Sequence, residues 1–240
     1  MKTNNSKQVA AFDQVLGYCN ALGTKYNPSK DSIKVAALTS LLTSAQEKVT
    51  AAENAKLNLV KEVNIRRETF KPIPGIATRI LNAMIAAEAS EELIADIRKY
   101  RDKLRGSNPG KTTKPEDSTN TTQPADTSRK KVSYLDFESK ADIFGSILTL
   151  INDAPAYEPN EAEFSIANLT ALFTTLRAKN KAVNDAKVVL KNARVARRAA
   201  LYGRAGLHGA AKRVKKYILF AFGATSDEYR TINSVSLKSR

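Results

Sequence analysis

Two stretches of about forty residues carry an apolar repeat that is typical of long α-helices. In residues 28–70 and again in residues 159–202, apolar side chains recur at alternating steps of four and three residues. A mean step of 3.5 residues is the pattern of a left-handed coiled-coil seam. At 1.5 Å per residue, a helix of about forty residues extends for roughly 60 Å, which is longer than one small globular core requires. The pattern therefore predicts an all-α chain built around two long helices.

Each seam changes character along its length. Its first half is apolar, and basic side chains then occupy seam positions: Lys56 and Arg66 in the first stretch, and Lys187, Arg194 and Arg197 in the second. Long basic side chains can lie along a seam with their charge in solvent. We expect the distal half of each long helix to project into solvent or to face a partner.

The two halves of the chain match one another at a single offset of 131 residues. The Tyr26-Asn27-Pro28 turn falls on Tyr157-Glu158-Pro159. The same shift aligns Leu38-Thr39 with Leu169-Thr170, Ala55-Lys56 with Ala186-Lys187, Arg66-Arg67 with Arg197-Arg198, and Gly75-Ile76 with Gly206-Leu207. A shared helical period alone would not align Pro, Gly and Arg-Arg together, so we interpret the chain as a tandem duplication. The alternative is one helical array whose pieces share a heptad pattern.

A polar segment separates the two halves. Residues 106–132 consist mostly of Ser, Thr, Asn, Pro, Gly, Lys and acids, and three prolines interrupt any helix there. Such a composition buries too little apolar surface to offset its ordering entropy. We therefore predict a first helical unit at 1–105, a flexible linker at 106–132 and a second helical unit with a short tail at 133–240. A long ordered loop is the alternative for the linker.

Shorter helices complete each predicted unit. Apolar steps indicate opening helices near 6–22 and 133–153, and returning helices at 76–87 and 210–222. A fourth helix at 91–104 has Ser90 as its N-cap and Glu91 and Glu92 in its first turn, where acids complement the helix dipole. The tail at 226–240 contains a sequence compatible with one helical turn.

The sequence offers little for catalysis or metal binding. One cysteine and one histidine exclude a disulfide framework and disfavour a Cys/His zinc site. Cys19 falls at an apolar helical step and is expected to be buried, and His208 has no nearby carboxylate to orient it. The glycines of residues 202–209 lack the GK-S/T of a phosphate-binding loop. We predict a non-enzyme with no catalytic, cofactor-binding or metal-binding residues and no small-molecule substrate.

Positive charge is the one strong chemical anomaly. The chain has 39 Lys and Arg against 24 Asp and Glu, a net charge of +15. Residues 177–216 hold 13 of these basic residues and a single acid, Asp185. Polyanions with phosphate backbones are common partners for such a stretch. The candidate polyanion-binding residues are Lys187, Lys191, Arg194, Arg197, Arg198, Arg204, Lys212, Arg213, Lys215 and Lys216. A solvated basic face and an acidic protein partner, including a second copy of the chain, are the alternatives.

No stretch is long and apolar enough to span a membrane, and the first residues lack the apolar core of a signal peptide. These absences predict a cytoplasmic protein.

The carboxyl-terminal stretch Val214-Lys-Lys-Tyr-Ile-Leu-Phe-Ala-Phe-Gly-Ala-Thr-Ser-Asp-Glu-Tyr-Arg230 resembles the ending of a family of helical bacterial proteins, found mainly in Bacteroidota. That ending reads FG-x-x-S-x-E/Q-Y-K/R. The Tyr26-Asn-Pro-Ser turn, the Phe70-Lys-Pro-Ile-Pro segment and the polar mid-chain segment extend the resemblance over nearly the whole chain. The family has no known activity, so the resemblance implies an accessory, non-catalytic role and assigns no site residues.

Together these features predict a structural or interaction protein. The leading interpretation is a rod-like helical scaffold that self-assembles, or docks onto another protein, through its long helices. The alternative is a nucleic-acid-associated protein that contacts the phosphate backbone through residues 177–216.

Overall fold

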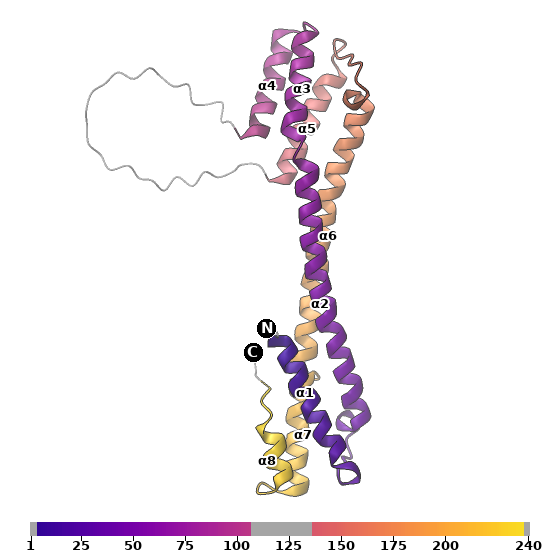
Figure 1. The fold of residues 1–240 in the computed structure, drawn as a ribbon, viewed down its shortest axis with the longest axis vertical. Helices are drawn as coiled ribbons and strands as arrows, with labels where there is room; N and C mark the ends of the chain where they lie inside the picture. Colours follow the sequence, from indigo (N-terminus) through magenta and orange to yellow (C-terminus); the bar gives the residue numbers. More distant parts are fainter. Residues whose placement is uncertain (1–3, 107–135, 238–240) are drawn as a thin grey trace, which may run out of the picture. The chain divides into compact units, whose positions relative to one another are not determined.

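The computed structural model describes residues 4–106 and 136–237, and this part of the chain is helical with no β-strand (Figure 1). The eight α-helices are α1 Asn4–Ala21, α2 Val35–Phe70, α3 Ile73–Ala86, α4 Glu91–Arg105, α5 Phe137–Asn152, α6 Ile166–Tyr202, α7 Leu207–Phe222 and α8 Asp227–Ser234. Two of them, α2 with 36 residues and α6 with 37, are the long helices that the seams predict. The expected all-α class is confirmed, and the predicted linker lies outside the described residues except for Gly106.

The chain divides into two compact units that draw on both halves of the sequence. Unit 1 comprises Met1–Val60 and Asp185–Arg240, and unit 2 comprises Lys61–Asn184. These units do not coincide with the expected ranges 1–105 and 133–240. The reason is that α2 and α6 each contribute one part to unit 1 and the other part to unit 2, so the packing partners of each sequence half are divided between the two cores.

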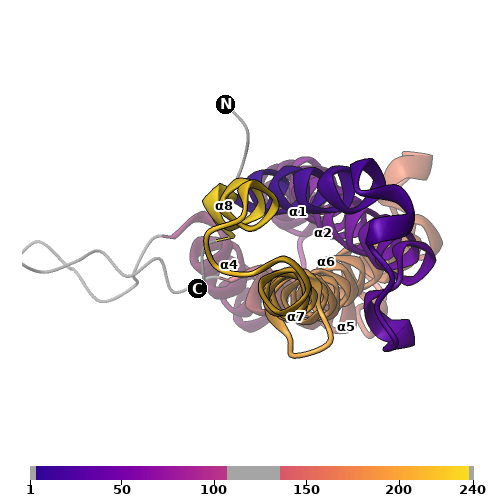
Figure 2. The same cartoon turned by 90° about the horizontal axis from the view of Figure 1, so that it is seen from below.

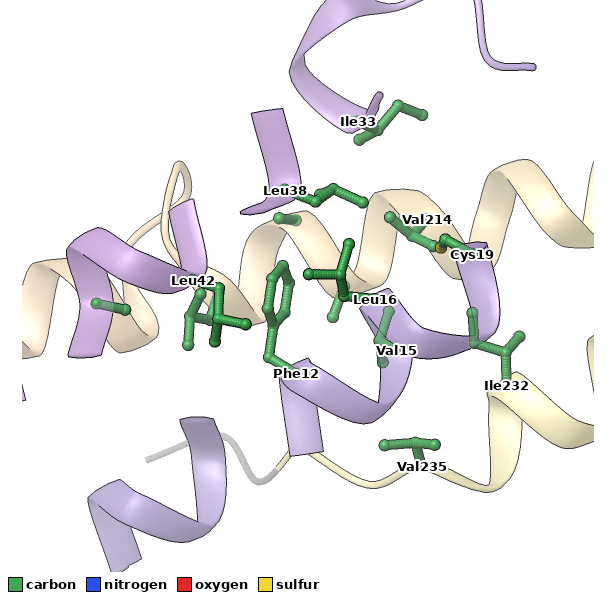
Figure 3. Packing of buried hydrophobic residues seen from close by; sticks show 14 of the residues in the cluster. Phe12, Val15, Leu16, Cys19, Ile33, Leu38, Leu42, Val214, Ile232 and Val235 are labelled. Atoms are coloured by element: carbon green, nitrogen blue, oxygen red, sulfur yellow. The ribbon is translucent and has the colours of Figure 1, made fainter. Parts of the chain in front are cut away.

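The core of unit 1 joins α1, α7 and α8 to the start of α2 and the end of α6. Figure 2 shows α1, α7 and α8 grouped together. Three residues of α1 are fully buried: Phe12, Val15 and Cys19. Figure 3 shows them packed with Leu38 of α2 and Val214 of α7. Ile232 and Val235 close the cluster from α8 and the residue that follows it. Burial at these positions follows the helical spacing of the apolar residues.

The core of unit 2 joins α3, α4 and α5 to the end of α2 and the start of α6. The three shorter helices lie side by side in Figure 1. Phe144 of α5, Ile80 and Met84 of α3, and Ile97 of α4 are fully buried there. Phe70, at the end of α2, is 4% exposed in the same core. The end of a long helix can therefore be a core element, contrary to our expectation for the distal halves.

Both long helices begin later than the prolines suggest. The repeats over residues 28–70 and 159–202 predict helices that begin at Pro28 and Pro159, where proline suits the first helical turn, but α2 starts at Val35 and α6 at Ile166. The intervening residues form the short 3₁₀ helices η2 Asp31–Ile33 and η3 Ala162–Phe164. The buried Tyr26 hydroxyl donates to the Ile33 carbonyl at 2.6 Å, which holds the backbone in a turn before the α-helix begins.

The predicted N-cap of α4 is confirmed. Ser90 Oγ accepts a hydrogen bond from the Leu93 backbone N–H at the start of α4. Ser226 does the same for Tyr229 in α8, which also has two acids in its first turn. Gly106 ends α4 and Gly223 ends α7, with φ of 78° and 84° that only glycine adopts without strain.

Elements of the two sequence halves correspond in position. η2 and η3 are 131 residues apart, as are the first residues of α2 and α6. Tyr157 repeats the Tyr26 bond, since its hydroxyl donates to the Phe164 carbonyl at 2.9 Å. In α1 and α5 the offset is 132, because buried Phe12, Val15, Leu16 and Cys19 correspond to buried Phe144, Ile147, Leu148 and Ile151. We call positions related by these two offsets corresponding positions.

Candidate functional site

A basic groove of about 600 Å³ lies on the surface of unit 1. Most of its lining comes from one face of α6, with one residue from α1 and one from α2. The lining residues are Asn5, Leu59, Lys187, Leu190, Lys191, Arg194, Val195, Arg197, Arg198 and Tyr202. We call this surface the α6 groove. Five of its ten residues are cationic and none is acidic.

Helical geometry places these cations in a row. Lys187, Lys191, Arg194 and Arg198 follow one another at steps of four, three and four, so they share one face of α6. At 1.5 Å per residue the row extends over roughly 16 Å along the helix axis. Tyr202, at the end of the row, packs against the core of unit 1 and fixes that end of the groove.

The floor of the groove is apolar. Leu190 is 5% exposed, and Leu59 of α2 is half-buried beside it in the lining. Val195 is 61% exposed. The groove therefore offers apolar contact as well as positive charge, which suits a ligand with both an anionic part and a flat or apolar part.

No carboxylate neutralises the row. Within residues 4–106 and 136–237, none of the five groove cations forms an ion pair. Two arginines of unit 2 differ in this respect: Arg177 Nη2 lies 2.6 Å from Asp142 Oδ1, and Arg79 Nη2 lies 2.6 Å from Glu163 Oε1. Unpaired like charges on one helix face repel one another, so an anionic ligand in the groove would relieve that repulsion.

Of the ten residues that the sequence nominates for polyanion binding, five lie outside the groove. Arg204, Lys212 and Lys216 are exposed elsewhere on unit 1. The other two have intramolecular partners. Arg213 donates to the Arg204 carbonyl at 2.9 Å. Lys215 Nζ donates to the carbonyls of Asn233 and Val235 at 3.1 and 2.6 Å, and burial lowers its pKa.

Five lining residues carry no charge and so could not be recognised from the charge pattern: Asn5, Leu59, Leu190, Val195 and Tyr202. Asn5 and Leu59 come from helices far away in the sequence, and only the fold brings them to α6. Tyr202 was visible in the sequence as an aromatic near the basic run, but nothing marked it as part of a groove. The sequence offset of 131 pairs Asn5 with Asp136, and only the matched burial of α1 and α5 pairs Asn5 with Phe137.

In unit 2, an aromatic side chain stands at the position that corresponds to Asn5. This residue is Phe137, and the Arg66 guanidinium lies 4.1 Å from the centre of its ring. Phe70 packs edge-on against the same ring, with ring centroids 5.0 Å apart. Arg66 and Phe70 correspond to Arg197 and Leu201 of unit 1. The place that Phe137 fills in unit 2 is thus lined in unit 1 by the small polar side chain of Asn5.

The other chemically reactive groups have structural surroundings. Cys19 is fully buried, and burial raises the pKa of its thiol to about 11, so the reactive thiolate is suppressed at neutral pH. His208 lies in the first turn of α7 and is half-buried. In the described part of the chain, no cluster of His, Cys, Asp or Glu is arranged to hold a metal ion. Nor does any described helix combine the length and apolar character that crossing a bilayer requires.

Comparison with known protein families, curated proteins and solved structures found no significant match to this chain.

Proposed function

We propose that the protein is a non-enzymatic helical binding protein whose α6 groove binds the phosphate backbone of a nucleic acid. The observation that carries the proposal is that the five cations lining one groove have no ion-pair partner among the described residues. Binding a polyanion would release its condensed counterions, which gives a favourable, salt-dependent contribution to affinity.

A nucleic acid fits this groove better than an acidic protein surface for two reasons. Three of the five cations are arginines, whose planar guanidinium binds phosphate in a bidentate manner and also stacks on bases. The cations follow one another along a helix, as the phosphates of a nucleic-acid strand do along its backbone. Carboxylates on a folded protein have no comparable regular spacing.

Salt dependence tests the proposal. The full-length protein is titrated against a fluorescein-labelled mixed-sequence oligonucleotide, and binding is followed by fluorescence anisotropy at several salt concentrations. If all five cations contact phosphates of a single strand, a plot of log Kd against the logarithm of the salt concentration should have a slope of about 3.5. Affinity should then fall about 100-fold between about 50 and 200 mM salt. Failure to bind at low salt would exclude the proposal.

A pair of charge-matched variants separates the groove from net charge. Lys191→Glu with Arg194→Glu reverses two groove cations, and Lys212→Glu with Lys216→Glu reverses two exposed cations of α7 outside the groove. Both variants change the net charge equally. We expect the first to weaken binding about 10-fold or more at low salt, and the second to change it by less than about 3-fold. Equal losses would mean that binding follows total charge and not the groove.

Docking through the long helices is the second candidate function. Five large apolar side chains on the unit 1 parts of α2 and α6 are at least half-exposed: Leu57, Val60, Val188, Val189 and Val195. Exposed apolar surface of this kind favours contact with a protein, including another copy of the chain. Self-association predicts a mass that rises with concentration in analytical ultracentrifugation. Leu57→Lys combined with Val188→Lys should return it to that of a monomer.

We also propose that the chain arose by tandem duplication with a linker between the copies. The corresponding 3₁₀ helices, the two Tyr hydroxyl bonds to residues seven positions later and the matched burial in α1 and α5 support this origin. The resemblance to the Bacteroidota proteins remains a prediction and supports the same accessory role.

A further inference from the structure

We infer that the α6 groove binds single-stranded nucleic acid, with one unpaired base seated beside Asn5 against the Arg197 guanidinium and the adjoining phosphates on Lys187, Lys191 and Arg194. This inference rests on the proposed function and deepens it by naming the form of the strand and the place of the base.

The corresponding site in unit 2 provides the first argument. There, the Phe137 ring lies 4.1 Å from the guanidinium carbon of Arg66 and contacts Phe70 edge-on. A guanidinium facing an aromatic ring is a favourable cation–π arrangement, and arginine stacks on nucleobases in the same way. Unit 1 keeps the arginine, as Arg197, but has Asn5 in place of the ring. The groove of unit 1 therefore has space and a stacking partner for a ring supplied from outside.

The second argument is that the two corresponding sites differ in positive charge as well as in the aromatic ring. The positions that correspond to Lys191 and Arg194 are the apolar residues Val60 and Val63. The site that lacks these two cations, on α2, is thus the one that a phenyl ring of the chain itself, Phe137 of α5, occupies beside Arg66. Where the ring is absent, two additional cations stand within two helical turns of Arg197. A ligand that replaces the ring should therefore carry negative charge next to a flat group, and a nucleotide unit of a single strand has both.

The form of the strand follows from the stacking contact, which requires an accessible base face. In a duplex, the face of each base is covered by its stacked neighbours, so only the sugar-phosphate backbone and base edges are accessible. A single strand can turn one base out of the stack and place its face on an arginine or aromatic side chain. The apolar floor formed by Leu59 and Leu190 suits the remaining surface of such a base.

The test uses three ligands with the full-length protein: an oligothymidylate, a duplex of equal length and inorganic polyphosphate. Thymine-containing single strands avoid internal base pairing, and polyphosphate supplies charge without bases. Competition against a labelled oligothymidylate should rank the single strand first, about 5-fold or more above polyphosphate of equal charge, because stacking of one base adds to the phosphate contacts.

Asn5→Phe tests the seat of the base. This variant introduces the ring that Phe137 supplies in unit 2, leaves net charge unchanged and should abolish the preference for oligothymidylate while retaining polyphosphate binding. Asn20→Phe is the matched control, since Asn20 is an exposed residue of α1 outside the groove. Arg197→Lys provides a second route that does not add volume: it keeps the charge but removes the stacking plane, and should lower the affinity for the single strand about 5-fold.

The outcomes distinguish the inference from the function on which it rests. Equal affinity for oligothymidylate and polyphosphate, unchanged by Asn5→Phe, would overturn the base seat and leave phosphate binding in place. Tighter binding of the duplex than of the single strand would also overturn it. No binding of any of the three ligands at low salt would exclude both the inference and the proposed function.

Discussion

At the scale of single residues, two tyrosines fix the turns that precede the long helices. Each hydroxyl donates to a carbonyl seven residues later, Tyr26 to Ile33 and Tyr157 to Phe164. Burial raises the pKa of Tyr157 to about 12 and that of Tyr26 further, so both hydroxyls stay protonated donors throughout the physiological range. The aromatic ring and the hydroxyl therefore have separate roles, one in the core and one in the turn.

Tyr26→Phe should destabilise unit 1 by about 1–2 kcal/mol, because the substitution removes a buried donor and leaves the Ile33 carbonyl without its partner. Urea denaturation followed by circular dichroism measures the loss. Tyr18→Phe is the control, since Tyr18 is 38% exposed on α1. A loss no larger than that of the control would mean that water replaces the missing hydroxyl.

The basic residues show how little a residue's charge says about its role. Lys191 and Lys215 look equivalent in the sequence, but Lys191 lines the open groove and Lys215 donates to two carbonyls at the end of α8. Net charge and the basic run were readable from the sequence, and five of the ten nominated residues do line one groove. The division between the two groups depends on tertiary contacts that neither spacing nor composition encodes.

At the scale of elements, α8 depends on contacts with its neighbours. It has eight residues, fewer than an isolated helix needs to be stable in water. Ser226 caps its start, and Lys215 of α7 binds the carbonyls of Asn233 and Val235 at its end. Ile232 is its fully buried anchor in the unit 1 core.

Lys215→Met should therefore loosen α8 without unfolding α7. The variant keeps the length of the aliphatic side chain but removes the donor and the positive charge at the carboxyl end of the helix. We expect the amide protons of α8 to exchange about 5- to 30-fold faster in hydrogen–deuterium exchange, corresponding to about 1–2 kcal/mol. Lys212→Met, at an exposed position on α7, should leave exchange in α8 unchanged. If the α8 amides exchange equally fast in both variants, Lys215 does not stabilise α8.

Helices and their caps were largely predictable because they depend on local sequence. The Ser90 cap, the glycine ends and the ends of the long helices at Phe70 and Tyr202 all follow from spacing and from the preferences of single residues. The start of α2 was placed seven residues too early. A proline suits the first helical turn in general, but here the hydroxyl bond of Tyr26 stabilises a 3₁₀ turn between Pro28 and the helix. That bond is a tertiary detail that the helical pattern does not contain.

At the scale of the whole molecule, the sequence similarity of the two halves does not describe how the cores are built. The apolar pattern shows which face of each helix is buried, but not which helix covers it. In unit 1 the helices α1 and the start of α2 pack with α7 and α8, and in unit 2 the helices α3 and α4 pack with α5 and the start of α6. Each core thus combines the early helices of one sequence half with the late helices of the other.

Because each core contains helices from both sequence halves, the chain should behave in a defined way when it is cut once between those halves. A protease site introduced between residues 107 and 135 yields an amino-terminal fragment with α1 to α4 and a carboxyl-terminal fragment with α5 to α8. Neither fragment contains all the helices of either core. After cleavage under native conditions, the two fragments should therefore migrate as one species in size-exclusion chromatography, with the helical circular dichroism of the intact protein.

The association should persist in 1 M salt, which reduces the Debye length to about 3 Å and so suppresses attraction between exposed charges. Burial of Phe12, Leu38 and Val214 in one core, and of Phe144, Ile80 and Ile97 in the other, does not depend on that attraction. Val214→Asp is the matching variant: a carboxylate in the unit 1 core should lower the urea concentration at which the cut fragments separate. Fragments that part in native buffer and keep their own helical structure would show that each sequence half folds by itself, which is incompatible with two cores built from both halves.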